Sequence, residues 1–171
     1  MKTINETIWK SVAVGAIAGL AGAWVMNEFQ SLLSRLSQSG QQPPGKKSEE
    51  ESEDATVKTA EAISKNLFQH ELTDEEKRWA GAAVHYGFGA TMGGLYGALT
   101  EMSPAASAGF GTGYGTAVWA VADEMGVSAL GLAPPIPDTD FSSHVKALAA
   151  HLVYGFTTDL ARRGILKLAR N

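Results

Sequence analysis

The chain has 171 residues, a formal net charge of −4 and no cysteine, and its length suits about one domain. The acidic balance argues against a nucleic-acid partner, because nucleic acids bind basic surfaces. The absence of cysteine excludes disulfides, thiolate metal sites and thiol catalysis. The mean hydropathy of −0.06 is close to neutral, but this average hides a strong segregation of charged from uncharged segments.

Three segments are almost free of charge: Ser11–Asn27, Trp79–Thr100 and Met102–Ala122. As helices, with a rise of about 1.5 Å per residue, they approach the thickness of a bilayer's hydrocarbon core, about 30 Å. The first follows a lysine, as in a signal peptide, but ends in WVMNEFQSLLSRL rather than a small-residue cleavage site. We therefore expect a retained first membrane helix over Asn5–Leu36, amphipathic toward its end.

The polar middle of the chain separates this first helix from the others. Ser37–Asp54 contains the turn-forming sequence PPG and a run of acids without apolar periodicity, so we expect a solvated loop. Ala55–His70 regains a helical period, which predicts a short amphipathic helix. This helix lies on the membrane surface or, as we favour, packs on its own bundle. Its apolar face consists of Val57, Ala60, Ile63 and Leu67.

Thr73 is expected to start the second long helix, because its hydroxyl can cap the amide of Glu76 while Glu76 reaches back. The run of charges stops at Trp79, which is typical of a membrane interface. The helix continues to about Glu101. Ser103–Pro104 ends it, because proline does not fit a helix interior.

The third helix follows at once and is expected to end near Leu132, antiparallel to the second. A rigid proline-rich loop, APPIPDTDFSS, comes next, and Ser142 or Ser143 can cap the fourth helix. That helix covers about His144–Ala169. Its charge-free part, Ala147–Thr158, is too short to span a bilayer alone, so we expect it to be the helix most enclosed by protein.

Together these elements predict an all-α fold, an integral membrane bundle of four glycine-rich helices plus a short amphipathic helix. The regions are the first membrane helix with its amphipathic extension (1–36), the polar acidic loop with the amphipathic helix (37–72) and a three-helix membrane region (73–171). Four spans put both termini on one side, and basic residues near both ends favour the cytoplasmic side. The acidic loop and the amphipathic helix would lie on the opposite side.

Glycines recur at every fourth position in the apolar segments. Helices in lipid associate through close backbone approach, which small residues at this spacing allow. Each glycine face has another helix of the chain or a second copy as its partner, so we expect a homo-oligomer or a subunit of a larger membrane complex, in a lipid bilayer. The predicted packing residues are Gly15, Gly19, Gly89, Gly93, Gly97, Gly109 and Gly113.

Six polar residues lie in or beside these spans, where an unpaired charge costs about 2.5–3.5 kcal/mol on insertion scales. Such groups persist when they face the bundle interior, pair with one another or line water. We expect Asp123 to turn inward to histidines of the second or fourth helix, and Glu124 to lie nearer water or a subunit contact. The full set is His85, Asp123, Glu124, His144, His151 and Asp159.

Three interpretations of this set stay open. We favour the structural one, in which Asp123 bonds to His85 or His151 and fixes the helix register. The second is a proton or ion path, because histidine titrates near neutral pH and a buried carboxylate can approach that range. The third is a metal site of His85, Asp123 and His151, although no close ligand spacing such as H-x-x-x-H is present. No catalytic residues can be identified, and no cofactor is expected.

Two C-terminal stretches, GLAPP at Gly131–Pro135 and SSHVKALAAHLVYGFTTDLARR at Ser142–Arg163, combine a histidine, an acid eight residues later and paired arginines. With the histidine of the second helix and the small-residue segment GAIAGLAGAW, they make the chain resemble the YagU-type family of small bacterial inner-membrane proteins. The resemblance covers the spans and not the acidic loop. One departure is Asp123, which stands where we align a histidine of the family.

The resemblance implies a multi-span protein of the bacterial inner membrane and brings no established activity. We therefore expect a structural or accessory membrane protein, or a self-assembling subunit, whose buried polar residues fix the bundle. The alternative is a small proton or ion channel, or a transporter, that uses His85, Asp123 and His151. An enzyme is the least supported class.

Overall fold

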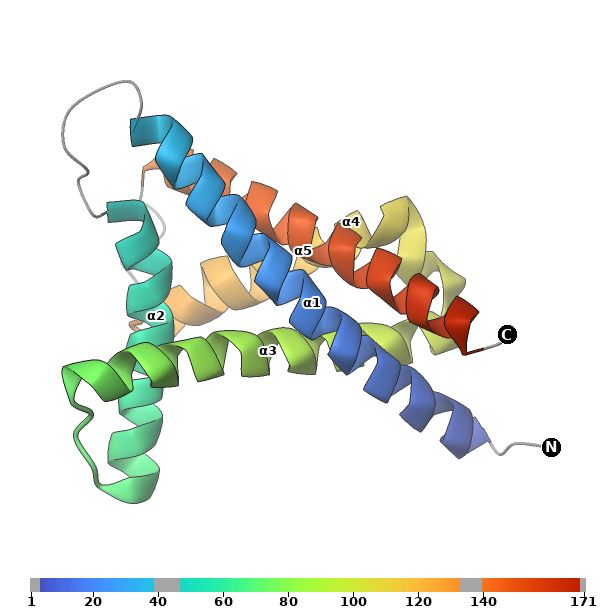
Figure 1. Cartoon of the computed structure of the whole chain (residues 1–171), viewed down its shortest axis with the longest axis horizontal. Helices are drawn as coiled ribbons and strands as arrows, with labels where there is room; N and C mark the ends of the chain where they lie inside the picture. The colour runs from blue at the N-terminus through green and yellow to red at the C-terminus, as the bar shows by residue number, and fades with distance from the viewer. Residues whose placement is uncertain (1–3, 39–46, 133–139, 170–171) are drawn as a thin grey trace.

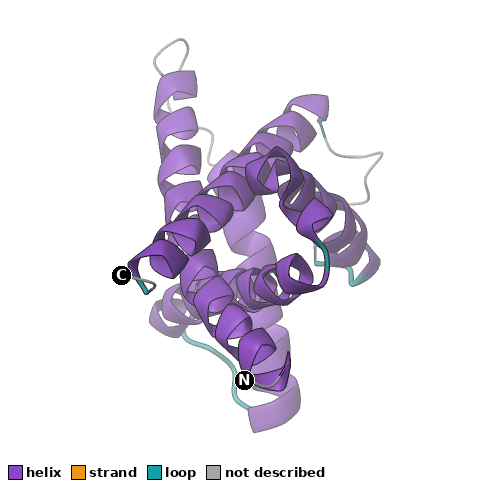
Figure 2. Ribbon diagram, turned by 90° about the vertical axis from the view of Figure 1, so that its right-hand side faces the viewer, coloured by secondary structure: helices purple, strands orange, loops and turns teal. Residues whose placement is uncertain are grey.

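The structure is a computed structural model that describes residues 4–38, 47–132 and 140–169. All regular structure in these ranges is helical, which confirms the all-α prediction (Figure 2). Three helices are long, namely α1 (Ile4–Gln38), α3 (Asp74–Met102) and α5 (Phe141–Leu168). The shorter ones are α2 (Lys47–Ile63), the π-helical η1 (Ser64–Phe68), the 3₁₀-type η2 (Pro104–Gly111), α4 (Thr112–Val118) and the π-helical η3 (Trp119–Val127).

Helices α1 and α3 pack through glycines on both sides of the contact. A Cβ atom on Gly15 would collide with the carbonyl oxygen of Gly93, and one on Gly19 would collide with that of Gly89. Because the order of these pairs runs in opposite directions along the two helices, α1 and α3 are antiparallel. Only residues without a Cβ allow the two backbones to come this close.

A second glycine contact joins α4 to α5. A Cβ atom on Gly111 would collide with the carbonyl oxygen of Gly155, and the reverse also holds. Two of the predicted packing glycines lie outside both contacts. Gly109 is left-handed, with a φ of 62°, and Gly113 is exposed on α4. Because α5 also packs along α1, the two glycine-packed pairs form one bundle.

The interior of the bundle holds small and polar side chains rather than large apolar ones. The largest fully buried side chains are those of Tyr96, Thr158 and Asp159. Of the described helices, the segment Glu6–Leu36 of α1 is long and apolar enough to cross a membrane. Large apolar side chains lie on the outside of the bundle, among them Ile17, Trp24, Phe88, Leu95, Val121, Phe156 and Leu160.

The acidic segment is more helical than the sequence suggested. Because α2 begins at Lys47, the prediction of a loop up to Asp54 is wrong from that residue on. Glutamate is a good helix former, and negative charge near a helix N-terminus is favourable. The amphipathic helix also ends before His70, because the chain passes into η1 and then turns at the left-handed Gln69 (φ 52°). The PPG sequence lies outside the described residues.

The arrangement of the helices places α2 apart from the chain ends. In Figure 1, α2 lies crosswise on the first part of α3, at one end of the bundle. The start of α1 and the end of α5 lie together at the opposite end (Figure 1). The packing of α2 on α3 agrees with the favoured prediction that this amphipathic helix contacts its own bundle.

Both predicted boundaries of α3 are confirmed. The Thr73 hydroxyl accepts a hydrogen bond from the amide of Glu76, and the Glu76 carboxylate accepts one of 2.8 Å from the amide of Thr73, so the capping box is present. At the other end, Ser103 is the C-cap and Pro104 occupies the first position of the next segment.

The third helix is not the continuous helix that we expected. Gly109, Phe110 and Gly111 are left-handed, with φ values of 62°, 55° and 81°, so the chain turns before a regular helix begins. That helix, α4, has seven residues and then widens into η3. Glycine adopts the left-handed conformation at little cost, which explains why GFGTGYG turns where an alanine-rich sequence would continue as a helix.

The fourth helix also starts differently from the prediction. Its N-cap is Asp140, whose side chain makes no capping hydrogen bond, and α5 begins at Phe141. Capping by Ser142 or Ser143 is therefore wrong, because both serines lie inside the first turn of the helix. Residues 133–139 of the proline-rich loop lie outside the described ranges.

Candidate functional site

Three of the predicted site residues lie along α5 and are progressively better covered. The side chain of His144 is 20% exposed. His151 is 9% exposed and Asp159 is fully buried. Because α5 packs against both α1 and α4, this polar face of α5 lies inside the bundle.

Glu124 and His144 form a short ion pair between η3 and α5. The Nδ1 atom of His144 lies 2.6 Å from Oε1 of Glu124, and both side chains are at most 20% exposed. Glu124, which we expected nearer water or a subunit contact, thus has its partner within the chain, on α5. Both acids lie within the π-helical η3, and π-helical turns are frequent at functional sites.

Asp123 lies beside Glu124 and faces the same group of histidines. Its carboxylate is half-buried and is within electrostatic range of His151 and His144. The Nδ1 atom of His151 lies 2.9 Å from the carbonyl oxygen of Ala147. A carbonyl only accepts hydrogen bonds, so Nδ1 carries the proton and Nε2 is the basic nitrogen of the neutral ring.

His85 approaches the same region from α3. Its Nε2 atom lies 3.4 Å from the carbonyl oxygen of Ala23, a long hydrogen bond to α1, and the ring is within electrostatic range of His151. The structure thus gathers five of the six predicted residues in one region of the bundle, along the two turns of α5 from His144 to His151, with Glu124, Asp123 and His144 at its edge. The sixth, Asp159, lies two helical turns beyond His151 on α5.

Asp159 belongs to a second polar cluster, at the end of the bundle where the chain termini lie. Oδ2 of Asp159 accepts a hydrogen bond of 2.7 Å from Nε of Arg163. The Arg163 guanidinium also lies over the ring of Phe110, 5.2 Å from its centroid. The hydroxyl of Tyr96 faces Asp159, yet neither this hydroxyl nor Oδ1 of Asp159 has a hydrogen bond of good geometry in the described structure.

The same cluster extends to α1 through Glu101. Oε1 of Glu101 accepts a hydrogen bond of 2.6 Å from the Ser11 hydroxyl and lies 3.6 Å from a terminal nitrogen of Arg162. Ser11 and Arg162 are buried. Neither was predicted as a site residue, although a buried arginine one turn after Asp159 could have been suspected from the cost of leaving that acid unpaired.

Two tyrosines connect the glycine-packed pairs across the interior. The hydroxyl of Tyr114 on α4 donates to the carbonyl oxygen of Met92, and that of Tyr154 on α5 donates to the carbonyl oxygen of Gly89, each at 2.7 Å. Both acceptors belong to α3. The sequence offered no signal for these bonds, because they depend on which helices become neighbours.

The proposed metal ligands do not converge on one point. Within the described residues, no group of three histidine, aspartate or glutamate side chains is arranged to hold a metal ion. Electrostatic proximity links His85, Asp123 and His151, and hydrogen bonds to backbone carbonyls orient both histidine rings. The geometry is therefore that of a titratable polar network.

Comparison with known proteins gives one match. The sequence profile of a family described as a protein of unknown function (DUF1440) matches residues 37–160, which is more than half of the chain. The matched region includes α2 to η3 and most of α5, and therefore the acid–histidine group and Asp159. No curated protein and no solved structure matches the chain significantly.

Proposed function

The chain belongs to the DUF1440 family of proteins of unknown function, and from this premise we propose that it is a multi-span membrane protein with a structural or accessory role. Four helical segments, α1, α3, α4 with η3, and α5, cross the bilayer. The buried polar residues hold these segments in register. The observation that carries the proposal is the inverted distribution of side chains between interior and surface.

In a water-soluble protein, large apolar side chains fill the core, and the burial of their surface away from water drives folding. Here Trp24 is 57% exposed, Val121 is 66% exposed and Leu160 is 59% exposed, while Asp159 and Thr158 are fully buried. Lipid chains satisfy outward-facing apolar side chains, and helices packed through small residues with polar groups inside are typical of membrane bundles.

A structural role is supported by the pairing of most buried polar groups within the chain. Glu124 pairs with His144, Asp159 pairs with Arg163, and two histidine rings bond to backbone carbonyls. Such pairs are best attested as devices that specify one arrangement of helices. Because the glycine faces of α1 and α3 are occupied within the chain, a homo-oligomer or a larger complex would assemble through the exposed apolar side chains.

Topology and location follow from charge. Lys10, Arg162, Arg163 and Lys167 lie near the end of the bundle where the termini meet, while α2 at the other end carries the acidic run. The positive-inside rule then assigns both termini to the cytoplasm. The resemblance to the YagU-type family supports the bacterial inner membrane as the location.

A second candidate is a proton or ion path along α5. It is favoured by buried polar atoms that have no hydrogen-bond partner in the described structure, among them the Tyr96 hydroxyl, Oδ1 of Asp159 and Nε of Arg162. These atoms continue the line that starts at His144 and passes His151.

In proteoliposomes with an internal pH dye, an imposed potential would drive proton entry that Asp123→Asn removes. Flux no greater than in protein-free vesicles overturns this candidate and leaves the structural one.

Cysteine accessibility tests the membrane proposal directly, because the chain has no cysteine of its own. A membrane-impermeant maleimide should react with Glu71→Cys in intact cells and with Lys167→Cys only in inside-out membrane vesicles, because the two positions lie on opposite sides of the membrane. Leu95→Cys, in the charge-free part of α3, should stay unlabelled until detergent is added. Labelling of Leu95→Cys without detergent, together with extraction of the protein by alkaline carbonate, would overturn the proposal.

A further inference from the structure

The end of the α2–η1 arm exposes three large apolar side chains. Ile63 is 45% exposed, Leu67 73% and Phe68 74%, and these three residues are called the η1 tip below. Single exposed apolar residues are common on proteins, but three within six residues form a patch that calls for a covering surface. Within the described residues, no other helix covers it.

The way α2 is held shows which direction the η1 tip faces. A small face of α2 packs on α3, where Val57 lies against Gly81 and Ala60 is 5% exposed. An ion pair of 2.8 Å between Glu61 and Lys77 supports this contact. Because α2 lies crosswise on α3 (Figure 1), it runs along the membrane plane when α3 crosses the bilayer, and η1 extends sideways past α3.

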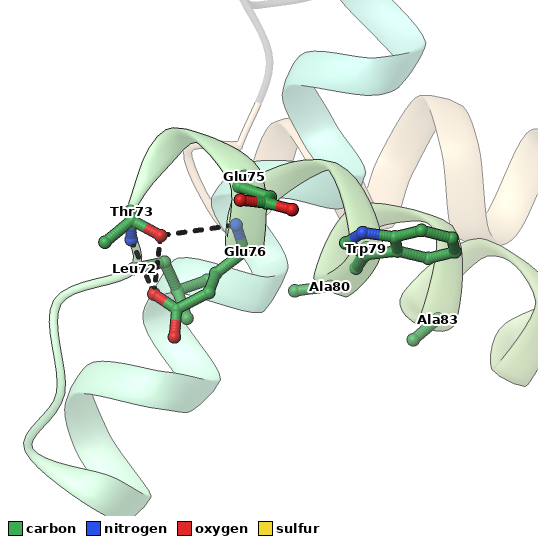
Figure 3. Close-up of a pocket in the computed structure, with 7 residues that line it drawn as sticks. All are labelled: Leu72, Thr73, Glu75, Glu76, Trp79, Ala80 and Ala83. Carbon is green, nitrogen blue, oxygen red and sulfur yellow. Dashed lines mark hydrogen bonds between the residues drawn. The ribbon is translucent and has the colours of Figure 1, made fainter.

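The first turns of α3 mark the depth at which the η1 tip lies. Over this stretch a shallow surface pocket has Leu72, Thr73, Glu75 and Glu76 on one side and Trp79, Ala80 and Ala83 on the other (Figure 3). Within α3 its lining changes from carboxylates to apolar groups within two turns, as a bilayer changes from headgroups to acyl chains. Trp79 is 74% exposed at this boundary, the position where tryptophan is enriched in membrane proteins.

We propose that the η1 tip inserts into the headgroup–acyl boundary of the bilayer that α3 crosses, so that α2 and η1 form an interfacial arm with lipid as its partner. The exposed apolar surface of α3 continues from Trp79 into the surface that faces lipid in the proposed function, and the η1 tip extends this surface sideways. Lys65, between Ile63 and Leu67, is exposed and suits contact with lipid phosphates. The inference rests on the proposed function.

The test uses a fluorescent label on single cysteines in the full chain. The polarity-sensitive dye NBD is attached at Phe68→Cys in the tip, at Asn66→Cys as the matched control on the same turn, and at Leu95→Cys in the charge-free part of α3. All three side chains are exposed, so folding is preserved, which circular dichroism checks. The proteins are reconstituted in vesicles of phosphatidylethanolamine and phosphatidylglycerol that contain lipids spin-labelled at a shallow or a deep position.

The expected result is a different pattern at each position. The label at residue 68 is quenched by shallow spin labels and is several-fold less sensitive to aqueous iodide than the label at residue 66. The label at residue 95 is quenched by deep spin labels. If residue 95 shows this quenching and residue 68 is as open to iodide as residue 66, the interfacial arm is wrong and the membrane bundle stands.

Two other outcomes are also decisive. Shielding of residue 68 from iodide without quenching by lipid means that a second copy of the chain or another protein segment covers the η1 tip, which overturns the inference. Absence of lipid quenching at residue 95 overturns the proposed function and the interfacial arm with it.

Discussion

The two glycine contacts of the bundle both bring helix backbones close together, but they differ in how regular the contacting helices are. Between α1 and α3, glycine faces glycine along regular α-helices, and the contact ends near the hydrogen bond from His85 to α1. Between α4 and α5, glycine faces glycine only where Gly111 and Gly115 meet Gly155, and the chain then widens into a π-helix that contains two acids.

The difference indicates where the chain departs from regular geometry. A contact that serves packing alone keeps the ideal helix, because every backbone hydrogen bond is already satisfied within it. The irregular elements η2 and η3 occur where buried acids must be placed, beside Asp159 and at Asp123 and Glu124. The α1–α3 pair is therefore the regular part of the bundle, and the α4–α5 pair, with η3, holds most of its shielded acids and histidines.

The largest effect is expected from Gly93→Ala in the α1–α3 contact. A Cβ atom there would collide with the backbone of Gly15 and lie 2.6 Å from the Cα of Gly19, so the helices must separate. Overpacking of this kind costs about 3 kcal/mol, at the upper end of its usual range. The measurement is the free energy of unfolding in mixed detergent micelles.

Gly87→Ala is the matched control, because nothing lies within 4 Å of that position. Its free energy of unfolding should rise by about 1 kcal/mol through helix propensity. Equal stability of the two variants would contradict the contact.

A smaller loss is expected from Gly155→Ala in the α4–α5 contact. The new Cβ atom would collide with Gly111 and lie 3.0 Å from the Cα of Gly115. Because α4 has only seven residues and follows a left-handed turn, it can shift, and the cost should be about 1–2 kcal/mol. Gly164→Ala on the same helix is the control, since its surroundings are open. A loss as large as that of Gly93→Ala would show that both contacts are equally rigid.

The Glu124–His144 pair should show measurable energetic coupling. A double-mutant cycle with Glu124→Gln and His144→Gln is expected to give about 1–2 kcal/mol, because both partners are largely shielded from water. The same cycle between Asp123 and His144 should give less, since these two residues share no hydrogen bond in the described structure. Coupling at Asp123 that equals or exceeds that at Glu124 would reverse the assignment of the two acids.

The smallest effect concerns the capping box outside the bundle. Two hydrogen bonds from Thr73 lower the pKa of Glu76 below its usual value of 4.5. The bond from the Thr73 amide has the larger effect, and the bond from its hydroxyl has the next largest. A lowered pKa means that this contribution is complete above the usual carboxyl range and is lost as the pH falls through the lowered pKa. Thr73→Ala should cost about 1 kcal/mol and bring the pKa of Glu76 part of the way back, as NMR of its carboxyl carbon would report. An unchanged pKa would mean that the hydroxyl plays no part.

Local signals predicted the boundaries of α3 well. The capping box at Thr73 and the proline at position 104 act through atoms within a few residues, so sequence is enough to recognise them. The same reasoning failed at α2, where a run of acids was taken for a loop although glutamate favours helix. It also failed at Gly109, which was assigned to helix packing and instead begins a left-handed turn with Phe110 and Gly111.

The candidate site was predictable in composition but not in pairing. Six titratable residues were visible as exceptions in apolar segments, and five of them gather in one region of the bundle, along two turns of α5. Their partners were not visible. Glu124 was expected near water and instead pairs with His144, because η3 is wider than an α-helix and turns this acid toward α5.

The sequence by itself determined the helical class, the limits of α3, the glycine faces of α1 and α3 and six polar candidates in the apolar segments, because each depends on residue type and spacing along one segment. Only the tertiary structure decided that Gly93 faces Gly15, that Tyr154 bonds to Gly89, and that Ser11 and Glu101 extend the cluster around Asp159. These are contacts between helices far apart in the chain. They depend on crossing geometry and on the π-helical turn, which no local pattern encodes.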